Sequence, residues 1–138
     1  VFQQFYLIPS LTVWENMVLP VKFGAQYSGK ELNDRAEYIL DKVGLSDRKD
    51  HTQKELSGGQ IQRVSIARAL ITNPDIVLAD EPTGNLDSKT GSEIIDLLFK
   101  INEDEGATIV IITHDVELID GVNHRIHLLD GEVEKIEQ

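Results

Sequence analysis

Two uninterrupted apolar runs, each followed by charged residues, constrain the fold of this chain more than any other feature. They occupy residues 76–79 and 109–112, the second within a predicted strand at 108–113, and a segment with helical periodicity, about residues 90–100, separates them. Neither run alternates between apolar and polar side chains, which is typical of strands buried on both faces. Such strands, separated by a helix, predict an α/β fold with a parallel sheet that is covered on both faces.

Two amphipathic helices are expected ahead of the first strand. In residues 30–43 apolar side chains recur at the 3.6-residue spacing of a helix, and Gly44 follows as a stop signal. A second helix is expected after Ser57, because a serine followed three residues later by Gln60 forms the capping-box pattern. Near the end of the chain, residues 126–136 predict a β-hairpin around an Asp-Gly turn.

The composition excludes several classes of protein. Hydrophobic residues make up 41% and charged residues 27%, as in ordinary soluble domains, and no run approaches the roughly 18 apolar residues of a membrane helix. The absence of cysteine excludes a disulfide scaffold and a thiolate zinc site. The net charge is −11, with most acidic residues in the second half of the chain. We therefore expect no nucleic-acid partner, because phosphate backbones attract basic surfaces.

Side chains suited to phosphate chemistry follow each apolar run. Asp80 and Glu81 come after the first run, and His114 comes after the second. Open parallel sheets bind ligands at the carboxyl ends of their strands. There Asp80 could hold Mg²⁺, Glu81 could polarise an attacking water as general base, and His114 could reach a γ-phosphate. Taken one at a time, these features are also compatible with a solvated turn and a structural histidine.

Residues 56–60, Leu-Ser-Gly-Gly-Gln, form a second candidate site. A helix that starts with Ser57, Gly58, Gly59 and Gln60 exposes backbone N–H groups and the positive end of its dipole, which favours a phosphate. The alternative is an ordinary capped helix after a Gly-Gly turn. Asp87, by itself, indicates a turn followed by a helix cap.

The ordered set of motifs resembles the nucleotide-binding domain of ABC ATPases. The set consists of Gln3, LSGGQ at 56–60, ADEP at 79–82, GNLD at 84–87 and THD at 113–115. The resemblance extends over the whole chain and implies a P-loop NTPase-like fold, with a parallel sheet core and an α-helical subdomain. Residues 2–11 and 79–88 resemble the lipoprotein-release and macrolide-export type of this family. Cell-division relatives of the same subgroup share the Pro-Thr-Gly-Asn-Leu-Asp motif, so the motif does not identify the substrate.

The resemblance also implies a role for each candidate residue. Gln3 would ligate Mg²⁺ and sense a transmembrane partner, and Asp80 and Glu81 would form the Walker B motif. His114 would be the switch histidine and Asp87 the D-loop aspartate. The signature motif, which closes over the γ-phosphate of ATP held by the other subunit, would comprise Ser57, Gly58, Gly59 and Gln60.

The phosphate-binding Walker A loop of the family has no convincing counterpart in this sequence. Residues 24–31 match G-x-x-x-x-G-K but end in Glu31, which would repel phosphate, and no buried strand leads into them. Ser28 is expected to cap a helix there instead. We therefore expect the C-terminal part of one nucleotide-binding domain, lacking the Walker A region. Residues 5–72 would hold the helical subdomain and signature helix, and residues 73–138 the segment from Walker B to the hairpin.

The implied function is that of an ATP-binding and ATP-hydrolysing subunit that powers a membrane transporter. Its cofactors would be ATP and Mg²⁺, and its partners a transmembrane permease and a second copy in a head-to-tail homodimer. It would be cytoplasmic and peripheral on the inner face of the cell membrane. Two alternatives stay open: a non-transport ABC ATPase of translation or DNA repair, and an inactive truncated fragment that acts only as an interaction module.

Overall fold

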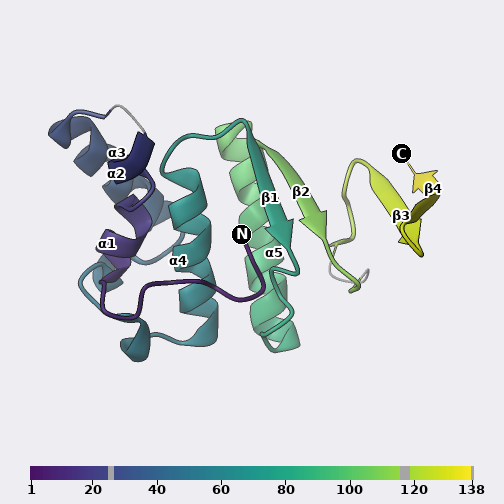
Figure 1. The fold of residues 1–138 in the computed structure, drawn as a ribbon, viewed down its shortest axis with the longest axis horizontal. Coiled ribbons are helices and arrows are strands. Elements are labelled where there is room, and N and C mark those ends of the chain that lie inside the picture. Colours follow the sequence, from purple (N-terminus) through teal and green to yellow (C-terminus); the bar gives the residue numbers. More distant parts are fainter. Residues whose placement is uncertain (25–26, 116–118, 138) are drawn as a thin grey trace.

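Figure 1 shows the computed structural model of the protein, which describes residues 1–24, 27–115 and 119–137. The first part is helical and contains α1 (Val13–Val18), α2 (Val21–Gly24), α3 (Gly29–Lys42), the short 3₁₀ turns η1 (Ser46–Arg48) and η2 (Gln53–Glu55), and α4 (Gly58–Leu70). The second part contains β1 (Ile76–Asp80), α5 (Ser88–Glu105), β2 (Thr108–Ile112), β3 (Arg125–Leu129) and β4 (Glu132–Glu137). Within the described residues, none of the helices combines the length and the hydrophobicity that a membrane span requires.

Side chains that cap backbone N–H groups determine where three of the helices begin. Thr12, Ser28 and Ser57 each accept a hydrogen bond from the residue three positions later, whose side chain in turn accepts from the backbone of the cap. The capping box predicted at Ser57 and the helix cap predicted at Ser28 are thereby confirmed. Within the Walker A-like match at residues 24–31, positions 25 and 26 lie outside the described residues.

Helix α5 is longer than the periodicity of its sequence predicted. It begins after Asp87, whose side chain accepts the backbone N–H of Thr90, and ends at Gly106. The φ angle of Gly106 is 68°, in the left-handed region that glycine adopts without steric cost. The cap and the glycine extend the helix beyond residues 90–100, up to the start of β2.

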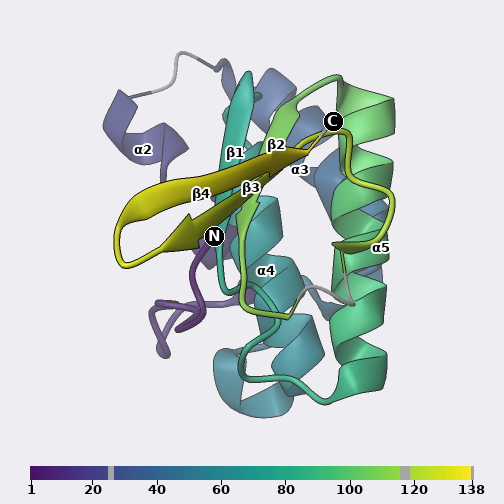
Figure 2. The same ribbon diagram turned by 90° about the vertical axis from the view of Figure 1, so that its right-hand side faces the viewer.

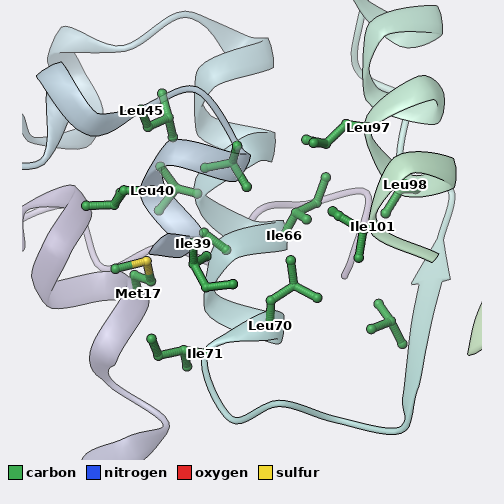
Figure 3. Packing of buried hydrophobic residues seen from close by; sticks show 14 of the residues in the cluster. Met17, Ile39, Leu40, Leu45, Ile66, Leu70, Ile71, Leu97, Leu98 and Ile101 are labelled. Atoms are coloured by element: carbon green, nitrogen blue, oxygen red, sulfur yellow. The ribbon is translucent and has the colours of Figure 1, made fainter. Parts of the chain in front are cut away.

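The hydrophobic core lies on both sides of α4. Figure 3 shows Ile66 and Leu70 of α4 between side chains of the helical part and side chains of α5. The labelled residues of the core are Met17, Ile39, Leu40, Leu45, Ile66, Leu70, Ile71, Leu97, Leu98 and Ile101. Full burial of each large apolar side chain contributes roughly 1.5–3 kcal/mol to the stability of the fold. Because the core continues across α4, this helix joins the helical part and the sheet part in one packed body.

Strands β1 and β2 are parallel, as predicted, but the helices cover only one face of their sheet. Val77 and Ala79 point toward the helices and are 3% and 0% exposed, whereas Leu78 and Ile112 on the opposite face are 63% and 57% exposed. The expectation that both faces are covered is therefore wrong for the described residues. The reason is that α4 and α5 both pack on the same side of the strands, as Figure 2 shows.

The predicted hairpin is confirmed by the antiparallel pairing of β3 and β4. Its turn residues, Asp130 and Gly131, have φ angles of 49° and 83°, and positive φ at both positions is typical of the two-residue hairpin turn. The hairpin stands in front of the uncovered sheet face in Figure 2, and its apolar side chains, such as Leu128 and Ile136, are largely exposed.

Candidate active site

The carboxyl ends of β1 and β2 lie next to each other because the strands are parallel and in register. Asp80 pairs with Ile112, so Glu81 and the segment Thr113-His114 leave the sheet together. Figure 1 shows the N-terminal end of α5 at the same edge. Open parallel sheets bind ligands at this edge, where the chain turns away from each strand.

The side chains of Glu81 and His114 meet across this edge. Oε1 of Glu81 lies 2.7 Å from Nδ1 of His114 and accepts the His114 backbone N–H at 3.1 Å. The hydroxyl of Thr113 donates to Oε2 of Glu81 at 3.3 Å. The Glu81 side chain is 23% exposed and that of His114 83%. The carboxylate is thus fixed by the end of β2, while the imidazole faces solvent where a ligand could reach it.

The backbone of Glu81 adopts an uncommon conformation that directs its side chain toward β2. Its φ angle is 44°, in the left-handed region that costs a non-glycine residue roughly 1–3 kcal/mol. Two hydrogen bonds hold it there: the Glu81 N–H donates to the carbonyl of Ile112 at 2.8 Å, and the Gly84 N–H donates to the Glu81 carbonyl at 3.2 Å. Backbone strain of this kind is concentrated at functional sites.

The contact with Glu81 changes the protonation of His114. The hydrogen bond from the imidazole to the carboxylate raises the pKa of His114 above its ordinary value, and the negative charge of Glu81 acts in the same direction. A larger fraction of His114 is therefore cationic near neutral pH. A cationic imidazole at this edge would attract an anionic ligand such as a phosphate.

A hollow of ≈ 150 Å³ lies beside this pair and is lined by Glu81, His114 and Asp87, among others. Asp87 accepts hydrogen bonds from the Thr90 hydroxyl at 2.7 Å and the Thr90 backbone N–H at 3.1 Å. Both bonds lower the pKa of Asp87, and the bond from the Thr90 hydroxyl has the larger effect. The fold brings these three predicted residues together around one space. This space is smaller than the roughly 300–1,000 Å³ of a site for a whole small-molecule ligand, and it fits a phosphate group or water.

Asp80 lies at the end of β1 and is exposed. Its backbone N–H donates to the carbonyl of Val1, and Phe2 forms an isolated parallel bridge with it. Among the described residues, its carboxylate has no hydrogen-bond or ion-pair partner, and no three acidic or histidine side chains form a metal cluster. A carboxylate of this kind can bind one position of a divalent cation whose other ligands come from elsewhere.

Gln3 lies close to the loop that follows β1. A Cβ atom added at Gly84 would stand 2.6 Å from Nε2 of Gln3, so a side chain at this position would displace the end of the Gln3 side chain. The side chain of Asn85 donates to the Gln3 carbonyl at 2.8 Å. These contacts bring Gln3 to the loop whose residue Gly84 also lines the hollow.

Three residues to which the sequence assigned no role hold this arrangement together. They are Asn85, Thr113 and Gln62. The first two stand inside the motifs at 84–87 and 113–115, which is the signal that could have identified them. Gln62 of α4 is 0% exposed and donates to the carbonyl of Pro82 at 2.6 Å and to that of Phe2 at 3.5 Å. Only the tertiary structure reveals this buried amide.

Residues 57–60 form the first turn of α4 and do not line the hollow described above. Ser57 and Gln60 bond to each other's backbone at 3.3 and 2.9 Å in the capping box. The first N–H groups of a helix have no partner within the helix and carry its positive end, so this turn can receive a phosphate. A Cβ atom at Gly59 would lie 2.5 Å from Cγ2 of Thr90, which shows how closely α4 and α5 approach here.

Comparison with protein families places these features in a known group. The family model described as "ABC transporter" matches residues 1–84. Three relatives align with all or nearly all of this chain. An uncharacterized ABC transporter ATP-binding protein, MJ0796 of Methanocaldococcus jannaschii, is 52% identical over 100% of this chain and 60% of its own length. The lipoprotein-releasing system ATP-binding protein LolD of Francisella tularensis is 46% identical over 99% of this chain and 59% of its own length.

The third relative is larger, and one of the three has been solved with a nucleotide. The macrolide export ATP-binding/permease protein MacB of Bdellovibrio bacteriovorus is 47% identical over 100% of this chain, which covers 21% of MacB. The structure of MJ0796 as a dimer in a post-hydrolysis state, bound to ADP and Pi, matches with a TM-score of 0.82 and 50% identity. It covers 100% of this chain, which spans 61% of the solved chain.

Proposed function

This chain belongs to the ABC transporter family, and on that premise we propose that it is the part of an ATP-hydrolysing subunit that activates the attacking water and powers a membrane transporter. The observation that carries this proposal is the contact of 2.7 Å between Glu81 and His114 at the carboxyl edge of the parallel strands. Residues 1–138 would form the C-terminal part of one nucleotide-binding domain. Residues 5–72 would form its helical subdomain and signature helix, and residues 73–138 the remainder.

Glu81 is the general base of the proposed reaction. Its carboxylate is held by the Thr113 hydroxyl and by the backbone N–H of His114. A remaining lone pair of the carboxylate could then accept a hydrogen bond from a water molecule in the hollow. Glu81 would accept a proton from that water as it attacks the γ-phosphate. His114 would hold the γ-phosphate, because its exposed ring carries more positive charge beside Glu81 than an isolated imidazole would.

Mg²⁺ would be held by Asp80 and Gln3. The donor set fits this ion, because a carboxylate without a partner among the described residues and an amide oxygen are both hard oxygen ligands. When bound, Mg²⁺ neutralises charge that develops on the phosphate oxygens. The chain's own contribution is to place Gln3 by its packing against Gly84 and by the hydrogen bond from Asn85 to the Gln3 carbonyl.

Residues 57–60 would act on the ATP bound by a second copy of the protein. They do not line the hollow at Glu81. Within one chain, a phosphate bound by these residues would therefore lie at a separate site. A head-to-tail homodimer would let the N-terminal turn of α4 in one copy close over the γ-phosphate of the other, with Asp87 near the dimer contact. The relative MJ0796 has been solved as a dimer, which supports the pairing of two copies.

A transmembrane permease is the proposed partner, with the chain peripheral on the cytoplasmic face of the membrane. The name of MacB, "ATP-binding/permease protein", supports the pairing, and LolD is named as the ATP-binding protein of a lipoprotein-releasing system. The transporter would be of the export or lipoprotein-release type, which residues 2–11 and 79–88 resemble.

The test is the substitution Glu81→Gln in the full-length subunit that contains this chain. Glu81→Gln keeps the shape of the side chain but removes the base, so ATP binding should persist while the rate of hydrolysis falls by about 10²- to 10⁴-fold. The matched control is Glu93→Gln on the exposed face of α5, where Glu93 pairs only with Arg63 among the described residues. Undiminished hydrolysis by Glu81→Gln would refute the role of Glu81.

A further inference from the structure

Arg68 of α4 binds the backbone of the segment that carries Gln3. Its Nη1 donates to the carbonyl of Tyr6 at 2.6 Å, and its Nη2 donates to the carbonyl of Phe5 at 2.9 Å. One guanidinium thus holds two successive peptide groups. A planar fork of N–H donors suits such a pair of acceptors, and the single ammonium of lysine cannot reproduce its geometry.

The backbone held by Arg68 is strained and belongs to the Gln3 turn, residues 2–6, where the chain bends at Gln3 and Gln4. Tyr6 has a φ angle of 46°, a conformation that a non-glycine residue keeps only where its surroundings fix it. The ring of Tyr6 packs edge-on against the ring of Phe2, with centroids 5.3 Å apart and planes at 89°. The contact between Phe2 and Tyr6 therefore joins the two ends of this turn, with Gln3 between them in sequence.

The two ends of this turn are attached to the same helix. At one end, the buried amide of Gln62 donates to the carbonyl of Phe2, and at the other Arg68 holds Phe5 and Tyr6. Both Gln62 and Arg68 belong to α4, whose first turn is capped by Ser57. Because α4 is a continuous helix packed in the core, the position of the Gln3 turn follows the position of α4.

We infer that Arg68 is a positioning residue that fixes the turn carrying Gln3 and ties it to the helix that begins with residues 57–60. This inference rests on the proposed function, in which Gln3 ligates Mg²⁺. Arg68 does not touch the reacting atoms. Without its two hydrogen bonds, the strained backbone at Tyr6 relaxes and Gln3 loses its fixed distance from the loop at Gly84. ATP binding does not depend on this distance, whereas the reaction step does.

The experiment compares Arg68→Met, Arg68→Lys and Arg63→Met in the full-length subunit. Arg63 is the matched control, because it also lies on α4 and donates to a backbone carbonyl, that of Val43 at 3.0 Å, away from the Gln3 turn. For Arg68→Met we expect kcat to fall roughly 10- to 100-fold, and the Mg²⁺ concentration for half-maximal rate to rise, with little change in the KM for ATP. Arg68→Lys should retain an intermediate kcat, and Arg63→Met should retain the unmodified kcat.

A double-mutant cycle with Gln3→Ala separates positioning from a general loss of stability. If Arg68 acts through Gln3, Arg68→Met should lower kcat less than about twofold once Gln3 is already alanine, at temperatures well below unfolding of each variant. Amide hydrogen exchange at residues 4–8 should be faster in Arg68→Met than in Arg63→Met.

Two results would overturn the inference about Arg68 while leaving the proposed function intact. One is an equal fall in kcat from Arg68→Met with and without Gln3, and the other is an unchanged kcat in Arg68→Met. In either case the unmodified subunit would still hydrolyse ATP and Glu81→Gln would not. An unmodified full-length subunit without ATPase activity would instead overturn both.

Discussion

Glu81 and His114 are 33 positions apart in sequence, yet their side chains meet at 2.7 Å between Oε1 and Nδ1. Three features of the fold produce this contact. The strands are parallel and in register, Glu81 adopts a left-handed backbone, and the Thr113 hydroxyl directs the carboxylate. The pair joins a partly buried carboxylate to an exposed imidazole.

Removing the carboxylate of Glu81 should lower the pKa of His114. Its hydrogen bond raises that pKa in the folded protein, so Glu81→Gln should return it toward the ordinary histidine value of about 6.5. A raised folded-state pKa means that protonated His114 favours the fold below the unfolded-state pKa. This contribution is lost as the pH rises through the folded-state pKa. A pH titration of the His114 ring protons by NMR measures the change.

The control for this titration is Glu132→Gln in the exposed hairpin. It removes the same charge in strand β4, outside the contact set of His114. An identical His114 pKa in the Glu81→Gln variant and in the unmodified protein would show that the contact is absent in solution.

Gly59 should tolerate no side chain as long as Thr90 keeps its methyl group. A Cβ atom at Gly59 would lie 2.5 Å from Cγ2 of Thr90, so Gly59→Ala should lower the free energy of unfolding by about 1–3 kcal/mol. Thr90→Ser removes that methyl group and keeps the hydroxyl that donates to Asp87. Adding Thr90→Ser to Gly59→Ala should therefore recover most of the loss, as measured by urea denaturation.

Gly29→Ala provides the comparison for Gly59→Ala. Gly29 is also in the first turn of a helix, but an added Cβ there meets no atom within 4 Å. Its substitution should be neutral or slightly stabilising, because alanine favours the helix over glycine. Equal destabilisation at both glycines would mean that the close approach of α4 and α5 is not the cause.

Glu105 should stabilise the attachment of α3 to α5 in a pH-dependent manner. It accepts hydrogen bonds from the Tyr38 hydroxyl at 2.6 Å and from Arg35 at 3.0 Å, and the Arg35 and Glu105 side chains are only 18% and 10% exposed. Burial by itself raises the pKa of Glu105, but these two hydrogen bonds, together with the positive charges of Arg35 and Lys42, outweigh it, and the pKa is lowered. The stabilisation is therefore present above the unfolded-state pKa and is lost as the pH falls through the lowered value.

Glu105→Gln should consequently reduce the free energy of unfolding at pH 7 by about 1–3 kcal/mol. The difference from the unmodified chain should shrink below about pH 4. Asp104→Asn is the control, since the neighbouring pair of Asp104 and Lys42 is more exposed and should contribute less. Denaturation of both variants at several pH values would contradict the prediction if their losses were equal and independent of pH.

Local sequence patterns were sufficient to predict most of the helices, strands and turns of this protein. The capping boxes at Ser28 and Ser57 and the hairpin turn at Asp130 and Gly131 depend on neighbours a few positions away. The residue types after each apolar run also placed Asp80, Glu81 and His114 at the carboxyl edge, because parallel strands end at one edge.

Contacts between distant parts of the chain were beyond such patterns. Leu78 and Ile112 are exposed because α4 and α5 pack on the opposite face of the sheet. The apolar run of a strand is compatible with one covered face or with two. Three contacts join segments that are far apart in sequence. The left-handed Glu81 donates its N–H to Ile112, the buried amide of Gln62 donates to Pro82, and Arg68 donates to Phe5 and Tyr6. The amino-acid pattern is enough to predict the elements and the chemistry at their ends, since both are local properties. Which side chains meet at those ends follows from the packed fold, because packing sets the distances between residues that are far apart in sequence.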